Sequence, residues 1–410
     1  MISVALSSGV YVFLFIALYF EVFLLLTYLE KRPEKRLARR ELFRYPTTTV
    51  IVPCFNEAKT VGRTLESLLA LDYPKEKLSI IVIDDGSTDT TFNISKGYEK
   101  YGAVRVLRKE NGGKHTALNL AIREADAELI GCLDADSFVD PQALREIVRY
   151  FIEEKEIMAV TPAIKVENPR NLLELMQRAE YNLGIFYKRM FGNMAAIPIL
   201  PGPFSIYRKE VFGRIGGFRN AHNTEDMEMT LRMHAHHMWI ENAHTAHVYT
   251  TVPNTIRTLV RQRTRWIQGF IQNSRDYRFM YFNRRFGALG LFVLPTGMLS
   301  IYSGLYLVGY SIYIFIVRII EKIISLSAID FALTPPELSL FFLKTSALFF
   351  LVLIIVPLTL FLMALGKRIA KDKIISFDVL CYLSLYGFLA PIWVGKAVLN
   401  AALAHSMSWR

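Results

Sequence analysis

The sequence predicts an α/β domain with a mostly parallel sheet, combined with membrane-spanning and interfacial α-helices. Of its 410 residues, 52% are hydrophobic, the mean hydropathy is positive, and long apolar runs lie near both ends. Between about residues 45 and 252, short β-branched runs alternate with segments of helical periodicity, which is typical of a parallel sheet. One soluble domain rarely combines this length with this apolarity, so we expect a globular domain plus membrane spans.

The first expected span covers residues 9–29, interrupted only by Glu21. A hydrocarbon core about 30 Å thick needs roughly 20 apolar residues in a helix. The basic residues follow this run, so we expect an uncleaved anchor and not a signal peptide. Glu21 and Lys396 are ionisable groups within expected spans. Such groups are candidates for function, with snorkelling or a polar contact inside the helix bundle as equal alternatives.

Three more apolar stretches follow, at residues 287–317, 340–365 and 377–404. Pro295 offers a point at which the first divides into an interfacial piece and a span, so we expect four spans and leave room for a fifth segment. Lys and Arg cluster after the first span and again at residues 366–373. Because cytoplasmic flanks collect basic residues, these clusters predict a cytosolic domain and both termini outside.

The formal net charge is +11, and much of the basic excess lies beside apolar segments. This placement favours an anionic membrane surface over a nucleic acid as the partner. Cys54, Cys132 and Cys381 are far apart and lack metal-ligand spacing. We therefore expect reduced thiols in the core.

Four short strands are expected in the central region, at residues 47–52, 78–83, 104–107 and 128–133. Helical spacing predicts helices over residues 60–71, with Thr60 placed as its cap, and around residues 118–125. Ligands of such sheets bind at the carboxyl ends of the strands.

Acidic residues occupy two of these strand ends: Asp84 and Asp85 follow the second strand, and Asp134 and Asp136 follow the fourth. A single carboxylate there is usually a cap or a turn residue, whereas two such clusters favour a site. Oxygen ligands in an Asp-x-Asp arrangement suit Mg²⁺ or Mn²⁺, which commonly bridge a carboxylate to a diphosphate.

Further along, Thr224-Glu225-Asp226 precedes a helical stretch that extends to residue 238. One interpretation is an ordinary helix start, because Thr caps helices and acidic residues favour their N-termini. The other is a general base, because a sugar hydroxyl needs a positioned carboxylate to become a good nucleophile.

Residues 255–275 alternate basic and apolar side chains and include Gln262, Arg263, Arg265 and Trp266. This pattern is typical of a helix on the membrane surface. Arginines also stabilise a leaving diphosphate, and Trp offers a flat face to a sugar ring.

Taken together and in this order, these four motifs resemble those of family 2 glycosyltransferases. Within that family the chain resembles the processive synthases of hyaluronan, chitin and cellulose, and the nodulation chitin oligosaccharide synthases. The resemblance implies a GT-A, Rossmann-like fold and an inverting single displacement. It also implies a cytosolic catalytic domain at the plasma membrane, a nucleotide-sugar donor, a glycan or lipid-linked acceptor, and Mg²⁺ or Mn²⁺ as cofactor.

The resemblance also implies a role for individual residues. Asp226 would be the general base, with Glu225 beside it. The donor would be bound by Pro53, Glu57, Asp84, Asp85, Lys114, Asp134 and Arg265. The acceptor would be bound by Gln262 and Trp266 and, in Pro201–Arg208, by Gly202 and Ser205. The metal would be held by Asp134 and Asp136, with His247 as a further candidate.

The expected organisation has four parts: a transmembrane helix at 1–30, a cytosolic GT-A domain at 31–253, interfacial helices at 254–286 and about three spans at 287–410. The leading hypothesis is a processive β-glycan synthase that uses UDP-N-acetylglucosamine or another UDP-sugar. The alternative is a single transfer to a membrane lipid. A sensor needs no base and a transporter needs more spans, so both are disfavoured. Membrane lipids are expected partners and nucleic acids are not, while the oligomeric state stays open.

Overall fold

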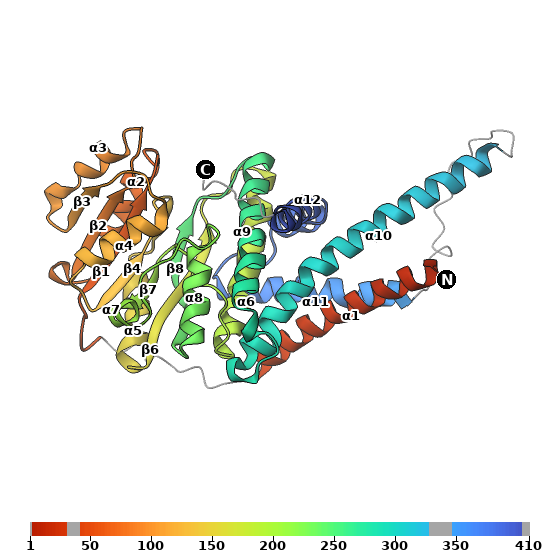
Figure 1. The fold of residues 1–410 in the computed structure, drawn as a ribbon, viewed down its shortest axis with the longest axis horizontal. Coiled ribbons are helices and arrows are strands. Elements are labelled where there is room, and N and C mark those ends of the chain that lie inside the picture. Colours follow the sequence, from red (N-terminus) through yellow and green to blue (C-terminus); the bar gives the residue numbers. More distant parts are fainter. Residues whose placement is uncertain (1, 31–41, 328–346, 404–410) are drawn as a thin grey trace.

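In the computed structural model, which describes residues 2–30, 42–327 and 347–403, a sheet domain and a set of long helices lie side by side (Figure 1). Two helices, α6 (Leu172–Asn193) and α9 (Ile256–Asp276), lie between the two parts. The predicted class, a mostly parallel sheet with helices plus candidate spans, is confirmed. The basic segment at residues 31–40 lies outside the described residues.

Eight strands form one sheet in the order β3-β2-β1-β4-β7-β6-β8-β5. The pairs among β1, β2, β3 and β4 are parallel, as is the pair β6–β8, whereas β7 and β5 pair antiparallel with their neighbours. The strands are β1 (Thr48–Cys54), β2 (Leu78–Asp84), β3 (Val104–Arg108), β4 (Leu129–Cys132), β5 (Ser137–Val139), β6 (Ile157–Val166), β7 (Ser205–Arg208) and β8 (Trp239–Thr250). The four predicted strands are β1 to β4.

Alternating side chains along the strands contribute to two hydrophobic cores, one on each face of the sheet. Val50 and Val52 of β1 pack in one core, whereas Ile51 packs in the other, because successive side chains of a strand point to opposite faces. The helices of the sheet domain are α2 (Val61–Leu69), α3 (Thr91–Lys96), α4 (Lys114–Glu124), α5 (Ala143–Glu153), α7 (Lys209–Ile215) and α8 (Glu225–Ala235). Side chains of α2 and α5 cover the first face, and those of α4, α7 and α8 the second.

The expected cap residues form other contacts. Thr60 precedes α2 and Thr224 precedes α8, but neither side chain caps its helix. Thr60 donates to the carboxylate of Glu57 at 3.1 Å. The hydroxyl of Thr224 accepts a hydrogen bond from Asn273 of α9 at 2.8 Å, so it ties the start of α8 to α9.

Among the described residues, three helices are long and apolar enough to cross a membrane: α1 over Ser8–Leu29, α11 (Ala347–Ile369) and α12 (Phe377–Ala402). The helix α1 as a whole covers Ile2–Leu29. The span expected over residues 287–317 falls on η5 (Leu289–Val293) and α10 (Leu294–Ser327). Pro295 stands in the first turn of α10, so it does not divide that helix, and a crossing by α10 stays a prediction.

The basic turn between α11 and α12 docks on the sheet domain. Lys367 Nζ lies 2.7 Å from both carboxylate oxygens of Asp378, and both side chains are fully buried. Arg178 of α6 donates to Asp378 at 3.0 Å, and Lys165 of β6 donates to the carbonyl of Ala370 at 2.7 Å. The turn therefore lies on the same side of the candidate spans as the sheet, as the charge pattern predicts.

The contact of Glu21 and the burial of the cysteines agree with the structural roles expected for them. Thr359 of α11 donates to buried Glu21 of α1 at 2.6 Å, which is a polar contact between two helices. Cys54, Cys132 and Cys381 are free and buried.

Candidate functional site

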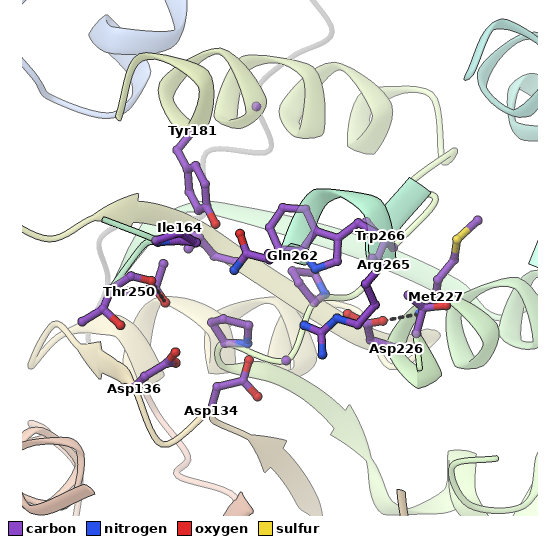
Figure 2. A pocket seen from close by; sticks show the side chains of 18 of the residues that line it. Asp134, Asp136, Ile164, Tyr181, Asp226, Met227, Thr250, Gln262, Arg265 and Trp266 are labelled. Carbon is purple, nitrogen blue, oxygen red and sulfur yellow. Dashed lines mark hydrogen bonds between the residues drawn. The ribbon is translucent and has the colours of Figure 1, made fainter. Parts of the chain in front are cut away.

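A cavity of about 830 Å³ is lined by residues at the carboxyl ends of β1 and β4 and by residues of α6, α9 and α12. Figure 2 shows Asp134 and Asp136 on one side of it and Tyr181 and Trp266 on the other. We call the first side the strand-end wall, and its residues are Pro53, Glu57, Asp134 and Asp136. We call the second the helix wall, and its residues are Tyr181, Lys188, Gln262, Trp266 and Tyr382.

The strand-end wall carries a cluster of carboxylates, and the ammonium group of Lys114 lies beside them. Lys114, the first residue of α4, lies 2.6 Å from Asp134 and 3.4 Å from Glu225. Burial alone would lower the pKa of Lys114, but Asp134, Glu225 and Asp226 outweigh it and raise that pKa. Lys114 therefore stays protonated and links the strand-end wall to α8.

Asp136 is a carboxylate whose ionisation is disfavoured by its surroundings. Burial, and after it the charges of Asp134 and Glu57, raise the pKa of Asp136 to about 7. Such a cluster of oxygen ligands suits a hard divalent cation, which would remove this repulsion. Within the described ranges no group of three or more His, Cys, Asp and Glu side chains is arranged to hold a metal, so two aspartates would need a ligand's oxygens to complete the coordination.

Glu225 and Asp226 occupy the first turn of α8 and both line the cavity. The carboxylate of Asp226 accepts a hydrogen bond from the backbone N–H of Met227 at 2.8 Å, drawn dashed in Figure 2. Burial, and then the neighbouring charge of Glu225, raise the pKa of Asp226 to about 6. A carboxylate with this pKa is suited to accept a proton near neutral pH.

Gly202 lies directly against the ion pair of Asp134 and Lys114. A Cβ at this position would lie 2.6 Å from both carboxylate oxygens of Asp134 and 2.7 Å from Lys114 Nζ. A side chain at this position would therefore displace the carboxylate or the ammonium group. Similarly, a Cβ on Gly269 of α9 would lie 2.3 Å from the hydroxyl of Thr224, so α9 and the start of α8 are in direct contact.

The helix α9 brings Gln262, Arg265 and Trp266 to the cavity. Between them in sequence, Arg263 donates to Glu180 of α6 at 2.8 Å. Its guanidinium lies 4.3 Å from the centroid of the Trp266 ring. Arg263 therefore fixes the ring of Trp266 against α6 by charge and by stacking.

Eleven predicted residues line the cavity: Pro53, Glu57, Lys114, Asp134, Asp136, Gly202, Glu225, Asp226, Gln262, Arg265 and Trp266. The structure does not bring Asp84, Asp85, Ser205 and His247 to this cavity.

Those four side chains have other surroundings. Asp84 is fully buried beside Arg108, and Asp85 accepts hydrogen bonds from Lys109 and from the backbone N–H groups of Gly112 and Gly113. Asp85 therefore shapes the loop that leads into Lys114.

Ser205 donates to the carbonyl of Pro201 at 2.6 Å, so its hydroxyl holds the turn before β7. Burial, and then the charges of Lys165 and Lys371, lower the pKa of His247 to about 4. These surroundings favour the neutral imidazole of His247, and its role as a ligand beside Asp136 stays a prediction.

Sequence reasoning missed several cavity residues, above all Tyr181 and Lys188 of α6, Asn242 of β8, and Tyr382 of α12. Lys188 had one available signal, because it is a cation next to the apolar run at residues 183–187. Asn242 gave none, since one Asn in a strand has many roles.

Comparison with known proteins agrees with this geometry. Residues 49–216 match the family described as Glycosyl transferase family 2. The chain is 28% identical over 381 residues to a poly-beta-1,6-N-acetyl-D-glucosamine synthase of Staphylococcus epidermidis, an alignment that covers 92% of this chain and 87% of that protein. It is 34% identical over 223 residues, 54% of each chain, to the synthase of the same name from Staphylococcus aureus strain COL.

A solved structure has the same fold. The mannosyltransferase PcManGT from Pyrobaculum calidifontis, in complex with GDP-Man and Mn2+, aligns with a TM-score of 0.63 and 19% sequence identity, over 98% of this chain and 99% of that chain. The fold is therefore that of a GT-A glycosyltransferase, as the motifs predict. Residues 49–216 therefore form a region similar to glycosyl transferase family 2, and the synthases that the chain resembles are similar to it along most of its length.

Proposed function

We propose that this enzyme is a processive synthase that transfers N-acetylglucosamine from UDP-N-acetylglucosamine to the growing end of a β-1,6-linked glycan, with inversion at the anomeric carbon. The observation that carries the proposal is that Asp134, Asp136, Asp226 and Trp266 all line the same cavity. The similarity to poly-beta-1,6-N-acetyl-D-glucosamine synthases over 92% of the chain supports the choice of sugar and linkage.

In the proposed reaction, the nucleotide lies along β1 against Pro53 and Glu57, and the diphosphate lies near Asp134 and Lys114. A divalent cation on Asp134 and Asp136 would neutralise the charge of the diphosphate when bound. Asp226 accepts the proton of the acceptor hydroxyl while that oxygen bonds to the anomeric carbon. The bond from this carbon to the diphosphate breaks and its electron pair leaves with UDP. Lys114 and Arg265 stabilise the departing negative charge.

The helix wall would hold the acceptor. Trp266 presents its ring to a sugar face, and Gln262 has a buried side-chain oxygen with no hydrogen-bond partner in the described part of the chain. Tyr382 of α12 also lines the cavity, so the acceptor side is continuous with a candidate membrane span. This continuity suits a product that leaves through the membrane from a cytosolic domain at the plasma membrane.

The proposal is tested with the purified full-length enzyme and radiolabelled UDP-N-acetylglucosamine, UDP-glucose and GDP-mannose, each with Mg²⁺ or Mn²⁺. We expect a ladder of products from UDP-N-acetylglucosamine alone, and its digestion by a hydrolase specific for β-1,6-linked N-acetylglucosamine. A single lipid-extractable product would replace the synthase by a single-transfer lipid glycosyltransferase. A ladder from a different donor would overturn the choice of sugar.

A further inference from the structure

Lys188 places an ammonium group on the helix wall, near Asp226. Tyr181, Gly184 and Lys188 follow one another at helical spacing on α6 and all line the cavity, because residues at these intervals share a helix face. Lys188 Nζ donates to the hydroxyl of Thr161 at 3.5 Å, which is a long hydrogen bond for a group with three donors. Burial lowers the pKa of Lys188 to about 8, against the opposing charge of Asp226.

Asn242 of β8 lies beside the same threonine. Its Nδ2 donates to the backbone carbonyl of Thr161 at 3.0 Å. Its Oδ1 is buried and has no hydrogen-bond partner in the described ranges, although the residue lines the cavity and is only 7% exposed. A buried acceptor without a donor costs free energy, so this oxygen marks a place where a ligand would supply an N–H or O–H group.

An irregularity in the sheet accompanies this arrangement. Thr161 is the register partner of Asn242, and Pro162 is that of Ala243, but the next pair is Ala163 with His247. The extra residues of β8 form an irregularity after Ala243, one residue beyond Asn242. Bulges occur near active sites and redirect side chains.

Lys188 contacts the hydroxyl of Thr161, and Asn242 contacts its backbone carbonyl. Together the ammonium of Lys188 and Oδ1 of Asn242 offer a donor and an acceptor, which match the two polar groups of a secondary amide. We propose that Lys188 and Asn242 form a subsite for the acetamido group of the acceptor sugar. The ammonium of Lys188 donates to the acetyl carbonyl oxygen, and Oδ1 of Asn242 accepts from the acetamido N–H. Pro162 and Ala163, which also line the cavity, provide apolar contact for the methyl group. This inference rests on the proposed function and adds a group that selects the acceptor.

The order of the strands assigns the subsite to the acceptor and not to the donor. The nucleotide side of the cavity lies at β1 and β4, whereas Thr161 and Asn242 lie on β6 and β8, beyond β7 in the sheet. A donor bound along β1 with its diphosphate at Asp134 therefore lies on the β1–β4 side of the cavity, separated by β7 from the strands that carry Thr161 and Asn242. The sugar next to Lys188 is the one whose hydroxyl is to be deprotonated.

The test compares two acceptors, a β-1,6-linked N-acetylglucosamine tetrasaccharide and the β-1,6-linked glucose tetrasaccharide, with UDP-N-acetylglucosamine as donor. In the Lys188→Met variant, kcat/KM for the acetylated acceptor should fall on the order of tenfold or more, as for the loss of a hydrogen bond to a charged group. The glucose acceptor should change less than about twofold, and KM for the donor should stay constant. Asn242→Leu should reduce the same ratio, and Lys188→Arg should restore part of it.

Lys209→Met is the matched control, because Lys209 lies on the surface and pairs with Asp126 at 3.2 Å. It should leave the acceptor ratio unchanged, and thermal melting should show that each variant is folded. An equal loss for both acceptors, or a raised KM for UDP-N-acetylglucosamine, would overturn the acetamido subsite but leave the synthase intact. Failure of the unaltered enzyme to use UDP-N-acetylglucosamine would instead reject the proposed function, and the subsite with it.

Discussion

The strand-end wall takes its residues from between positions 53 and 136, whereas the helix wall takes its residues from between positions 181 and 382. Parallel strands of the first half of the sheet bring Glu57, Asp134 and Asp136 to one edge. Three helices, α6, α9 and α12, bring Tyr181, Trp266 and Tyr382 together. The strand-end wall is rich in negative charge, and the helix wall is rich in aromatic rings. The difference suggests that changes on the first wall affect the donor and changes on the second affect the acceptor.

The largest effect is expected at Asp226, which stands between the walls. Asp226→Asn should lower kcat on the order of 10³-fold while UDP-sugar binding survives, because only the proton acceptor is lost. Calorimetry with UDP and single-turnover kinetics measure the two quantities. Because the pKa of Asp226 is raised from 3.8 to about 6 on folding, its ionisation destabilises the fold increasingly between these two pH values and fully above the higher one. The variant should therefore melt no lower than the unaltered enzyme at pH 8, and retained turnover would remove Asp226 as the base.

The next largest effect tests whether Asp134 and Lys114 need their observed positions. Gly202→Ala forces Asp134 and Lys114 apart, since its Cβ would lie under 3 Å from both. A displacement of about 1 Å costs roughly 10²-fold in rate, and donor affinity should fall with it. Gly213→Ala is the control, because nothing lies within 4 Å of a Cβ there. Full activity in Gly202→Ala would show that the ion pair is not needed in its observed position.

The dependence on pH gives a smaller effect and needs no substitution. The pKa of Asp226 is raised to about 6, so the carboxylate is protonated and inactive below that pH. At saturating donor, kcat at pH 5 should be about a tenth of that at pH 7. The sign is that activity falls as pH falls. A flat profile from pH 7 to pH 5 would contradict the assignment of the base.

The smallest effect is expected at Arg263, which contacts Trp266 of the helix wall. Arg263 holds the ring of Trp266 and pairs with Glu180. The double variant Arg263→Met/Glu180→Gln removes the stacking without leaving a buried charge unpaired. KM for the acceptor should rise about threefold to tenfold, as for the loss of a cation–π contact, with KM for the donor constant. A change in donor KM instead would break the division between the two walls.

Sequence predicted the strand-end wall well. The β-branched runs predicted β1 to β4, and residues directly after parallel strands meet at one sheet edge whatever the rest of the chain does. The same reasoning applies to Asp84 and Asp85, but the structure does not bring them to the cavity. Both follow β2 as predicted, but Arg108 and the loop into Lys114 occupy their carboxylates.

The helix wall depends on contacts that no local pattern contains. The sequence indicates that residues 255–275 form a basic amphipathic helix, and a membrane surface and a protein partner would select the same pattern. Packing decided that α9 buries Arg263, Gln268 and Asn273 against other helices.

By itself, the sequence determined the class of the fold, three of the candidate spans and the motifs that resemble family 2 glycosyltransferases, because periodicity and strand-end chemistry are properties of short segments. Only the tertiary structure decided that β7 and β5 enter the sheet antiparallel, that α12 lines the cavity, and that Lys188 and Asn242 flank Thr161. The physical reason is that these contacts join residues far apart in the chain, and such pairings are set by the packing of whole elements.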